Sequence, residues 1–136
     1  MTNVPSRLSI IIPSRNEAKY IAATLTQFEK LLERHNLEIV VSDANSTDGT
    51  AEIVQEFAVR FPGRVKLAQK PGKQNIAIGR NFGASQATGT ILFHTDADVR
   101  IPDPERFFPK VMQTFENPAV VAATVPIWVY PEESGI

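Results

Sequence analysis

The sequence contains no cysteine and only two histidines among its 136 residues. Without cysteine, disulfides and thiolate zinc sites are excluded, and two histidines are too few for a histidine-rich metal cluster. Any bound metal would therefore be held mainly by oxygen ligands. The net charge is only −1, and the scattered lysines and arginines form no basic stripe, which argues against a nucleic-acid partner.

Long apolar runs are also missing. The first run, at 8–12, is too short for a signal peptide, and the apolar-rich segment 119–130 is too short to span a bilayer. We therefore expect a chain with no membrane span, cytoplasmic or held at the inner face of a membrane through a part not included here. The motifs G-x-x-x-x-G-K-[ST], G-x-G-x-x-G and G-x-S-x-G are absent as well, which removes the main signals of ATPases, dinucleotide-binding proteins and α/β-hydrolases.

Short strands and helices alternate along the chain. Segments rich in Ile and Val predict strands at 8–12, 37–42, 65–69, 90–95 and 120–126. The strands are nearly continuous apolar runs, which is typical of a mostly parallel sheet covered on both faces. We therefore predict an α/β fold, a doubly wound, mostly parallel sheet sandwiched by helices. The length fits one domain, residues 1–136.

Four helices are predicted between these strands. The first, over about 17–34, carries an apolar stripe at helical spacing, formed by Ile21, Leu25, Phe28 and Leu32. The second follows NSTDGT, in which Ser46 or Thr47 is the expected N-cap. The third, over about 74–87, is rich in Ala and Gly and can lie very close to the sheet. The fourth runs over 104–116, where Pro109 either splits the helix or marks its first turn.

Polar, turn-prone loops follow four of the strands, and ligands in an open α/β sheet bind outside the carboxyl ends of the strands. The loops SRNE, DANSTDGT, KPGKQN and DADV are therefore expected to converge on one edge. Asp43 is either a turn or capping residue or accepts hydrogen bonds from a nucleotide. Lys73, Arg80 and Asn81 either grip phosphate or base or belong to a solvated surface.

Asp96 and Asp98 end the apolar run that precedes them. At positions i and i+2 of an extended chain, their side chains point to the same side, roughly 6 to 7 Å apart at Cα. A solvated turn is the plain interpretation. The alternative is a divalent site, because Mg²⁺ and Mn²⁺ are commonly bound by one or two carboxylates together with substrate phosphates. A nucleoside diphosphate would complete such a site.

Four ordered segments, LSIIIPSRNE, IVVSDANSTDGT, GRNFGASQATG and ILFHTDADV, resemble the nucleotide-binding half of the family 2 inverting glycosyltransferases. The resemblance covers about residues 8–126 and implies the GT-A fold, whose nucleotide-binding half is Rossmann-like. It implies transfer of a sugar from a nucleotide-diphosphate donor, most often a UDP-sugar, to an acceptor hydroxyl with inversion. It also implies a divalent cation, Mn²⁺ or Mg²⁺. The acceptor, whether a glycan, a lipid or a small molecule, is left open.

The resemblance also implies roles for individual residues. The loop after the first strand borders the nucleotide, the acid after the second hydrogen-bonds the base, and the last acid of D-x-D coordinates the metal. The metal ligands expected here are Asp98 and Asp96, where Asp96 contacts the ribose or the metal shell. Together with the loop residues considered above, the expected nucleotide-sugar contacts are Pro13, Arg15, Asn16, Glu17, Asp43, Lys73, Arg80 and Asp96.

One element of the family is missing from the sequence. The catalytic base normally lies in the acceptor-binding half, and this chain ends 38 residues after Asp98 (136 − 98), so the base is expected beyond residue 136. Glu132 and Glu133 come too early and are interpreted as a solvated tail. Two alternatives stay open. The chain could be a non-catalytic nucleotide-binding module, or a haloacid-dehalogenase-type phosphatase with Asp96 as nucleophile.

Overall fold

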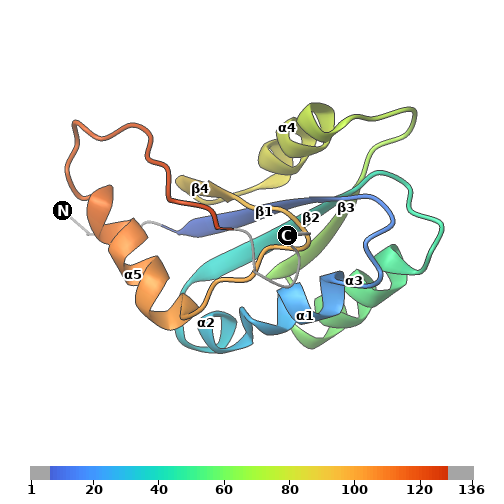
Figure 1. Ribbon diagram of the computed structural model, residues 1–136, viewed down its shortest axis with the longest axis horizontal. Coiled ribbons are helices and arrows are strands. Elements are labelled where there is room, and N and C mark those ends of the chain that lie inside the picture. Colours follow the sequence, from blue (N-terminus) through green and yellow to red (C-terminus); the bar gives the residue numbers. More distant parts are fainter. Residues whose placement is uncertain (1–6, 129–136) are drawn as a thin grey trace.

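Figure 1 shows the computed structural model, which describes residues 7–128. Its sheet is built from the strands β1 (Leu8–Ser14), β2 (Leu37–Asp43), β3 (Val65–Gln69) and β4 (Ile91–His94), in the order β3-β2-β1-β4. Every pairing is parallel. Ser14 pairs with Asp43, and Asp43 pairs with Gln69, so β1, β2 and β3 finish side by side at their carboxyl ends. The predicted parallel α/β sheet is confirmed.

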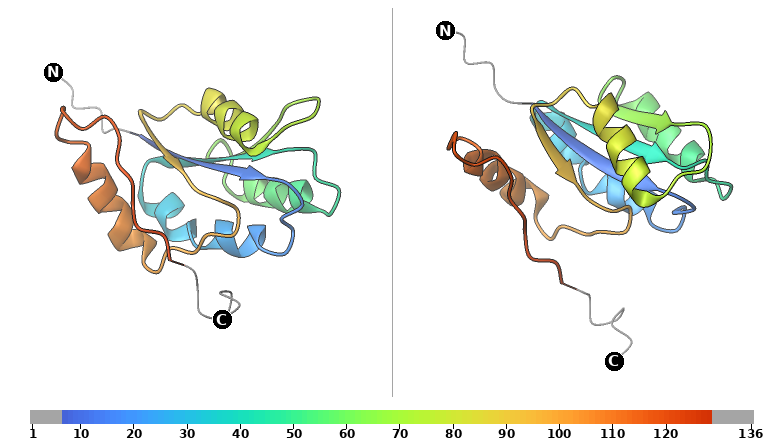
Figure 2. Two further views of the ribbon diagram at one scale, coloured as in Figure 1. Left: turned by 45° about the horizontal axis from the view of Figure 1, so that its top comes forward. Right: turned by 90° about the horizontal axis from the view of Figure 1, so that it is seen from above.

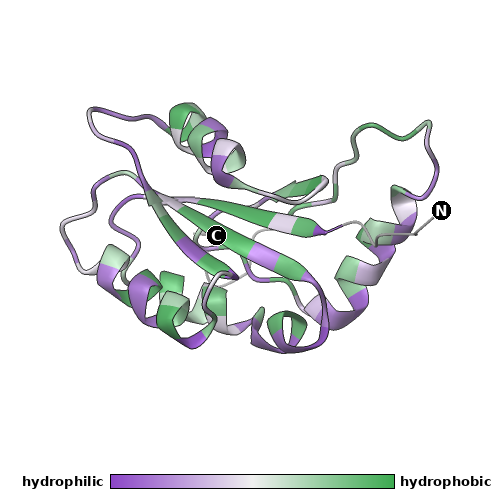
Figure 3. Ribbon diagram, turned by 180° about the vertical axis from the view of Figure 1, so that it is seen from behind, coloured by the Kyte–Doolittle hydropathy of each residue, from purple (hydrophilic) through white to green (hydrophobic). Residues whose placement is uncertain are grey.

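Helices cover both faces of the sheet, as predicted. Figure 2 shows α4 (Ile76–Gln86) on one face and α1 (Ile21–Thr26), α2 (Glu29–Arg34) and α3 (Thr50–Arg60) on the other, with α5 (Pro104–Thr114) beside α2. The strands are largely hydrophobic in Figure 3. Successive strand residues point to opposite faces, so Ile10 and Ile12 join the core beneath α1–α3, while Ile11 lies beneath α4.

Helix α4 lies very close to the sheet, as its small residues predict. A Cβ atom at Gly83 would come within 2.7 Å of Ile11 Cγ2 and 3.2 Å of Ser42 Cβ. At Gly79 the corresponding distance to Pro13 Cβ would be 3.5 Å, an ordinary van der Waals contact. The absence of a side chain at Gly83 therefore sets the distance between helix and sheet. This brings the start of α4 close to the ends of β1 and β2.

The long helix predicted over about 17–34 is wrong in its continuity and its start. The chain forms α1 and α2 with a break at Gln27 and Phe28, and α1 begins only at Ile21. At the break, the backbone N–H of Phe28 donates to Leu25 O, three residues back, which tightens the turn. The predicted stripe is nevertheless buried, because all four of its side chains are 0% exposed: Ile21, Leu25, Phe28 and Leu32.

The start of α3 differs from the predicted cap. Gly49 occupies the N-cap position with φ of +96°, a left-handed conformation that glycine adopts without strain. Neither Ser46 nor Thr47 caps the helix, because Ser46 bonds to other loops, described below. Helix α4 begins at Ile76, two residues later than predicted, and Asn75 is its N-cap, with the side chain accepting a hydrogen bond from Ile78 N.

Helix α5 runs without interruption through Pro109, so neither predicted effect of this proline occurs. Pro104 takes the first turn, and the Asp103 side chain caps the helix by accepting from Arg106 N. Phe108 beside the proline is 2% exposed and packs edge-to-face against Phe28, with ring centroids 5.9 Å apart. Packing of this kind outweighs the missing hydrogen bond of a proline inside a helix.

The strand predicted at 120–126 is wrong. The chain there has no regular secondary structure, and Val121 is 90% exposed. A β-rich composition forms a strand only where a partner strand and a face to cover are available, and the described sheet ends at β4. The acidic pair Glu132 and Glu133 lies outside the described residues. Within residues 7–128, no helix combines the length and apolarity that crossing a bilayer requires.

A buried acid, Glu38, lies near the amino ends of the strands. It is 0% exposed, and its Oε2 lies 2.7 Å from Lys66 Nζ and 3.5 Å from Arg7 Nη2. The hydroxyl groups of Ser9 and Thr88 donate to Oε1 at 2.7 and 2.9 Å. Burial raises the pKa of Glu38, but the bonds from Lys66, Thr88 and Ser9 outweigh it and lower the pKa to about 2. This acid is therefore charged, and the fold compensates its charge with Lys66, Arg7 and the two hydroxyl groups.

Candidate functional site

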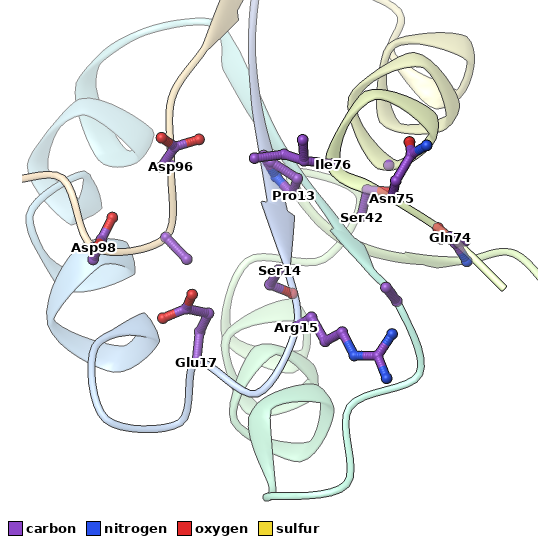
Figure 4. Close-up of a pocket in the computed structure, with 13 residues that line it drawn as sticks. Pro13, Ser14, Arg15, Glu17, Ser42, Gln74, Asn75, Ile76, Asp96 and Asp98 are labelled. Carbon is purple, nitrogen blue, oxygen red and sulfur yellow. The ribbon is translucent and has the colours of Figure 1, made fainter.

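A cavity of about 380 Å³ opens at the carboxyl edge of the sheet (Figure 4). Each of the four polar loops contributes to its wall, so the predicted convergence of the loops is confirmed. The lining residues are Pro13, Ser14, Arg15, Glu17, Ser42, Ala44, Gln74, Asn75, Ile76, Gly79, Asp96, Ala97 and Asp98. Five of the predicted site residues are among them: Pro13, Arg15, Glu17, Asp96 and Asp98. Asn16, Asp43, Lys73 and Arg80 do not line the cavity.

One side of the cavity is acidic. In Figure 4, Asp96, Asp98 and Glu17 lie on the same side of the cavity. Burial raises the pKa of Glu17, and the negative charges of Asp98, Asp48 and Asp96 raise it further. Carboxylates gathered in this way create a field that attracts a cation.

The turn that carries the two aspartates is anchored by helix α1 and its C-cap. Ala97, between the aspartates, is 2% exposed, and its carbonyl accepts a hydrogen bond from the Thr24 hydroxyl. Gln27 donates through Nε2 to Val99 O at 2.9 Å, and its Oε1 accepts from Ile101 N at 2.8 Å. The sequence contains no signal for Thr24 or Gln27, because each of these three bonds spans more than 70 residues.

Arg80 is paired with Asp96. Its Nη2 atom lies 2.7 Å from Asp96 Oδ1, with the two side chains 39% and 45% exposed. Arg80 therefore reaches the cavity through Asp96 and fixes the direction in which that carboxylate points. The neighbouring His94 has a pKa lowered by burial and by the positive charge of Arg80.

Asp43 is completely buried, and its carboxylate is filled by four hydrogen bonds. Oδ1 accepts from the hydroxyls of Ser14 and Ser46 at 2.9 and 2.6 Å. Oδ2 accepts from Ser46 N at 2.9 Å and from Gln69 Nε2 at 3.2 Å. Four bonds use the whole acceptor capacity of a carboxylate. In this structure Asp43 therefore holds together the ends of three strands.

The two loops after β1 and β2 are joined by side-chain hydrogen bonds. Asn16 has a left-handed backbone, with φ of +52°. Its N–H donates to Ser46 Oγ at 2.8 Å, while its Oδ1 accepts from Thr47 N at 2.9 Å. Asp48 Oδ2 accepts from Ala18 N at 3.0 Å. Ser46 and Asp48 thus hold the two loops together, and Asn16 supports the loop from outside the cavity.

The side of the cavity opposite the acids is lined by polar groups and by the positive charge of Arg15 (Figure 4). Its polar groups include Ser42 from β2, Asn75 at the N-cap of α4 and Gln74 just before it. Sequence reasoning missed Ser42 and Gln74. A signal existed for Gln74, which directly follows Lys73 in a loop already expected at this edge. For Ser42 none existed, because it is an ordinary small polar residue at the end of a strand.

A divalent cation fits the acidic side of the cavity. Within the described ranges, no group of three Asp, Glu, His or Cys side chains could hold a metal ion on its own. Mg²⁺ and Mn²⁺ do not require such a cage, since they usually take one or two carboxylates together with substrate oxygens and water. Asp98 and Asp96, in the field that also raises the pKa of Glu17, match that donor set.

Several curated proteins are similar to this chain in sequence. A dolichol-phosphate mannosyltransferase from Pyrococcus furiosus is 32% identical over 116 residues, which are 85% of this chain and 32% of the relative. The succinoglycan biosynthesis protein ExoA from Rhizobium meliloti is 34% identical over 116 residues, 83% of this chain and 35% of the relative. The chain thus spans about a third of the length of these relatives.

Solved structures of glycosyltransferases share the fold. A mannosyltransferase from Pyrobaculum calidifontis, in complex with GDP-Man and Mn²⁺, superimposes with a TM-score of 0.68 at 30% identity over 81% of this chain and 32% of that one. Residues 1–349 of TarS from S. aureus, in complex with UDP, give a TM-score of 0.67 at 25% identity over 89% of this chain and 38% of that one. The expected GT-A fold is confirmed by these neighbours.

The family itself is identified by a profile match along nearly the whole chain. The model described as glycosyl transferase family 2 matches residues 9–135. This match includes all four loops that line the cavity and both aspartates of the D-x-D motif. The chain belongs to glycosyl transferase family 2.

Proposed function

We propose that this chain is the nucleotide-sugar-binding domain of a glycosyltransferase. The donor is a nucleoside-diphosphate sugar, with UDP-sugars favoured, and the sugar is transferred to an acceptor hydroxyl with inversion. The observation that carries the proposal is the cavity at the carboxyl edge of the sheet, acidic on one side and lined by polar groups and Arg15 on the other, in a chain of this family. A diphosphate and a nucleoside need these two different environments.

The acidic side of the cavity is proposed to bind the divalent cation, Mn²⁺ or Mg²⁺, through Asp98 and Asp96. The ion supplies positive charge for the diphosphate that leaves. Arg80 orients Asp96 through their ion pair at 2.7 Å. Among the similar structures, the mannosyltransferase from P. calidifontis was solved with Mn²⁺ and GDP-Man. This supports a divalent cation and a nucleotide-diphosphate sugar as the molecules that bind here.

The remaining predicted residues fall into two groups. Pro13, Arg15 and Glu17 line the cavity and are proposed to border the nucleotide. Lys73 precedes Gln74 of the cavity wall. Its flexible, positively charged side chain is proposed to contact a phosphate of the nucleotide. Asn16 and Asp43 act indirectly, by fixing the loops on which the lining residues are carried.

A base must deprotonate the acceptor hydroxyl as it attacks the sugar. Asp98 is assigned to the metal, so it is not this base. We propose that the base lies beyond residue 136, in the acceptor-binding half that the resemblance implies. A non-catalytic nucleotide-binding module is the second candidate, since Asp96 and Asp98 are assigned to the metal and no residue of the described cavity wall is assigned as the base. Membership of glycosyl transferase family 2 argues against the alternative of a haloacid-dehalogenase-type phosphatase.

The proposal is tested by titrating the chain with UDP and GDP, each with and without Mn²⁺, followed by hydrolysis assays with UDP-sugars. We expect binding that depends on Mn²⁺. Turnover would identify an enzyme, and binding without turnover would identify a binding module. If neither nucleotide binds in the presence of Mn²⁺, the proposed function is wrong.

The metal assignment is tested by Asp98→Ala, with Glu56→Ala as a control because Glu56 is exposed on α3, away from the cavity. We expect Asp98→Ala to weaken Mn²⁺-dependent UDP binding by about a hundredfold, equivalent to about 2.7 kcal/mol. The control is expected to bind as the wild type does. Unchanged affinity in Asp98→Ala would contradict the assignment.

A further inference from the structure

Gln74 lies in the wall of the cavity with one of its two polar atoms unused. The residue is 9% exposed, and its Nε2 donates to Lys70 O at 2.6 Å. Turning the amide over would place two oxygens against each other, so the orientation of the amide is fixed by chemistry. Oε1 is therefore an obligatory acceptor. Within residues 7–128 it has no hydrogen-bond partner.

Ser42 presents a second unused polar group to the same cavity. It is 1% exposed, and its Oγ has no hydrogen-bond partner in the described part of the chain. It lies under the start of α4, where a Cβ at Gly79 would be 3.9 Å from the hydroxyl. Buried polar groups in native proteins are nearly always paired, so each exception requires an explanation.

The two groups lie on the side of the cavity opposite the acids (Figure 4). A ligand whose diphosphate lies beside Asp96 and Asp98 would extend its nucleoside toward this opposite side, which also carries Arg15. One wall then offers an acceptor from Gln74 and a hydroxyl from Ser42 that can donate. The edge of uracil offers the complementary pair, a ring N3–H beside a carbonyl. Guanine offers the same pair with N1–H and its carbonyl.

We infer that Gln74 accepts the ring N–H of the nucleobase and that Ser42 donates to a neighbouring carbonyl of the same base. Gln74 is then the residue that determines which bases the site accepts. This inference rests on the proposed function. It gives base recognition to Gln74, whereas the resemblance in sequence implies that role for Asp43. The reason is that the carboxylate of Asp43 already accepts four hydrogen bonds.

The decisive measurement compares a nucleotide with its ring-methylated form. In the presence of Mn²⁺, the wild type is titrated with UDP and with N3-methyl-UDP, and likewise with GDP and N1-methyl-GDP. We expect methylation of the preferred nucleotide to weaken binding by about tenfold or more, the factor that corresponds to 1.4 kcal/mol. The methyl group removes the donor that Gln74 requires.

The matching variant is Gln74→Leu, which keeps the size of the side chain and removes its acceptor. It should bind the preferred nucleotide about tenfold more weakly and discriminate less than about twofold between that nucleotide and its methylated form. Gln55→Leu, the same substitution at an exposed position of α3, should retain full discrimination. Mn²⁺-pyrophosphate, which has no base, should bind equally to Gln74→Leu and the wild type.

The outcomes separate the inference from the proposed function. If the wild type binds UDP or GDP and their methylated forms equally well, the inference is overturned while the proposed function stands. If the wild type binds neither nucleotide, both fall. Equal losses for the nucleotide and for pyrophosphate in Gln74→Leu would also overturn the inference.

A second variant covers the case in which Gln74→Leu fails to fold. Ser42→Ala should weaken binding of the preferred nucleotide by about threefold to tenfold and leave pyrophosphate binding unchanged. Ser85→Ala, at an exposed position of α4, is its control. Full affinity in Ser42→Ala, together with equal binding of the methylated nucleotide by the wild type, would overturn the inference without any Gln74 variant.

Discussion

A single acid, Glu38, lies at the amino edge of the sheet and a group of acids lies at the carboxyl edge, and their surroundings in the fold differ. At the amino edge, Glu38 is fully buried, engaged by Lys66 and two hydroxyls, and has its pKa lowered to about 2. At the carboxyl edge, the pKa of Glu17 is raised by burial and by the charges of neighbouring acids. An acid compensated within the fold stabilises it, whereas an acid left in the field of other acids is available for a ligand.

The largest effect is expected from removing the compensated acid. Glu38→Ala leaves Lys66, Arg7 and two hydroxyls without their shared acceptor, and should lower the free energy of unfolding by roughly 3 kcal/mol. Urea unfolding measures this loss. Glu33→Ala, at an exposed position of α2, should change stability by less than about 0.5 kcal/mol. Similar values for the two variants would remove the contrast between the two edges.

The pH dependence of stability should show the same acid. The folded pKa of Glu38, about 2, lies below its ordinary value of 4.5. Its contribution is therefore present above pH 4.5 and is lost as the pH falls from 4.5 toward 2. Urea unfolding between pH 6 and pH 2 should show this loss in the wild type and a shallower one in Glu38→Gln. Identical pH profiles of the wild type and Glu38→Gln would mean that Glu38 has the same pKa in the folded and the unfolded state.

A smaller effect is expected at the ion pair between Arg80 and Asp96 at the carboxyl edge. Arg80 and Asp96 are both partly exposed, so Arg80→Gln should lower the free energy of unfolding by less than about 1 kcal/mol. The same variant should alter Mn²⁺-dependent nucleotide binding, because Asp96 loses the group that orients it. A large loss of stability with unchanged binding would show that Arg80 is structural instead.

The smallest change in stability is expected at Glu17. Because its pKa is raised, its contribution is fully present below pH 4.5 and is lost as the pH rises through the raised value. At neutral pH, Glu17→Gln should therefore unfold at the same or a slightly higher urea concentration than the wild type. Destabilisation as large as that of Glu38→Ala would show that the two edges are alike.

Much of the fold could be predicted from local sequence patterns. Apolar runs identified the four strands, and the spacing of Ile21, Leu25, Phe28 and Leu32 identified the buried face of the first helical segment. The predictions failed where contacts between residues far apart in the sequence determine the local structure. The break at Gln27 is accompanied by bonds to Val99 and Ile101, and the segment 120–126 lacks a partner strand within the described residues.

The candidate site, too, could be predicted from the sequence only in part. The sequence by itself determined that polar loops follow four apolar strands and that Asp96 and Asp98 follow the last of them. The reason is that hydrophobic patterning locates strands and loops along the chain. Only the tertiary structure decided which polar groups face the cavity. Ser42 and Asp43 are neighbours whose side chains point to opposite faces of the sheet. The packing of α4 placed the first in the cavity wall, while bonds from the ends of β1 and β3 and from Ser46 enclosed the second.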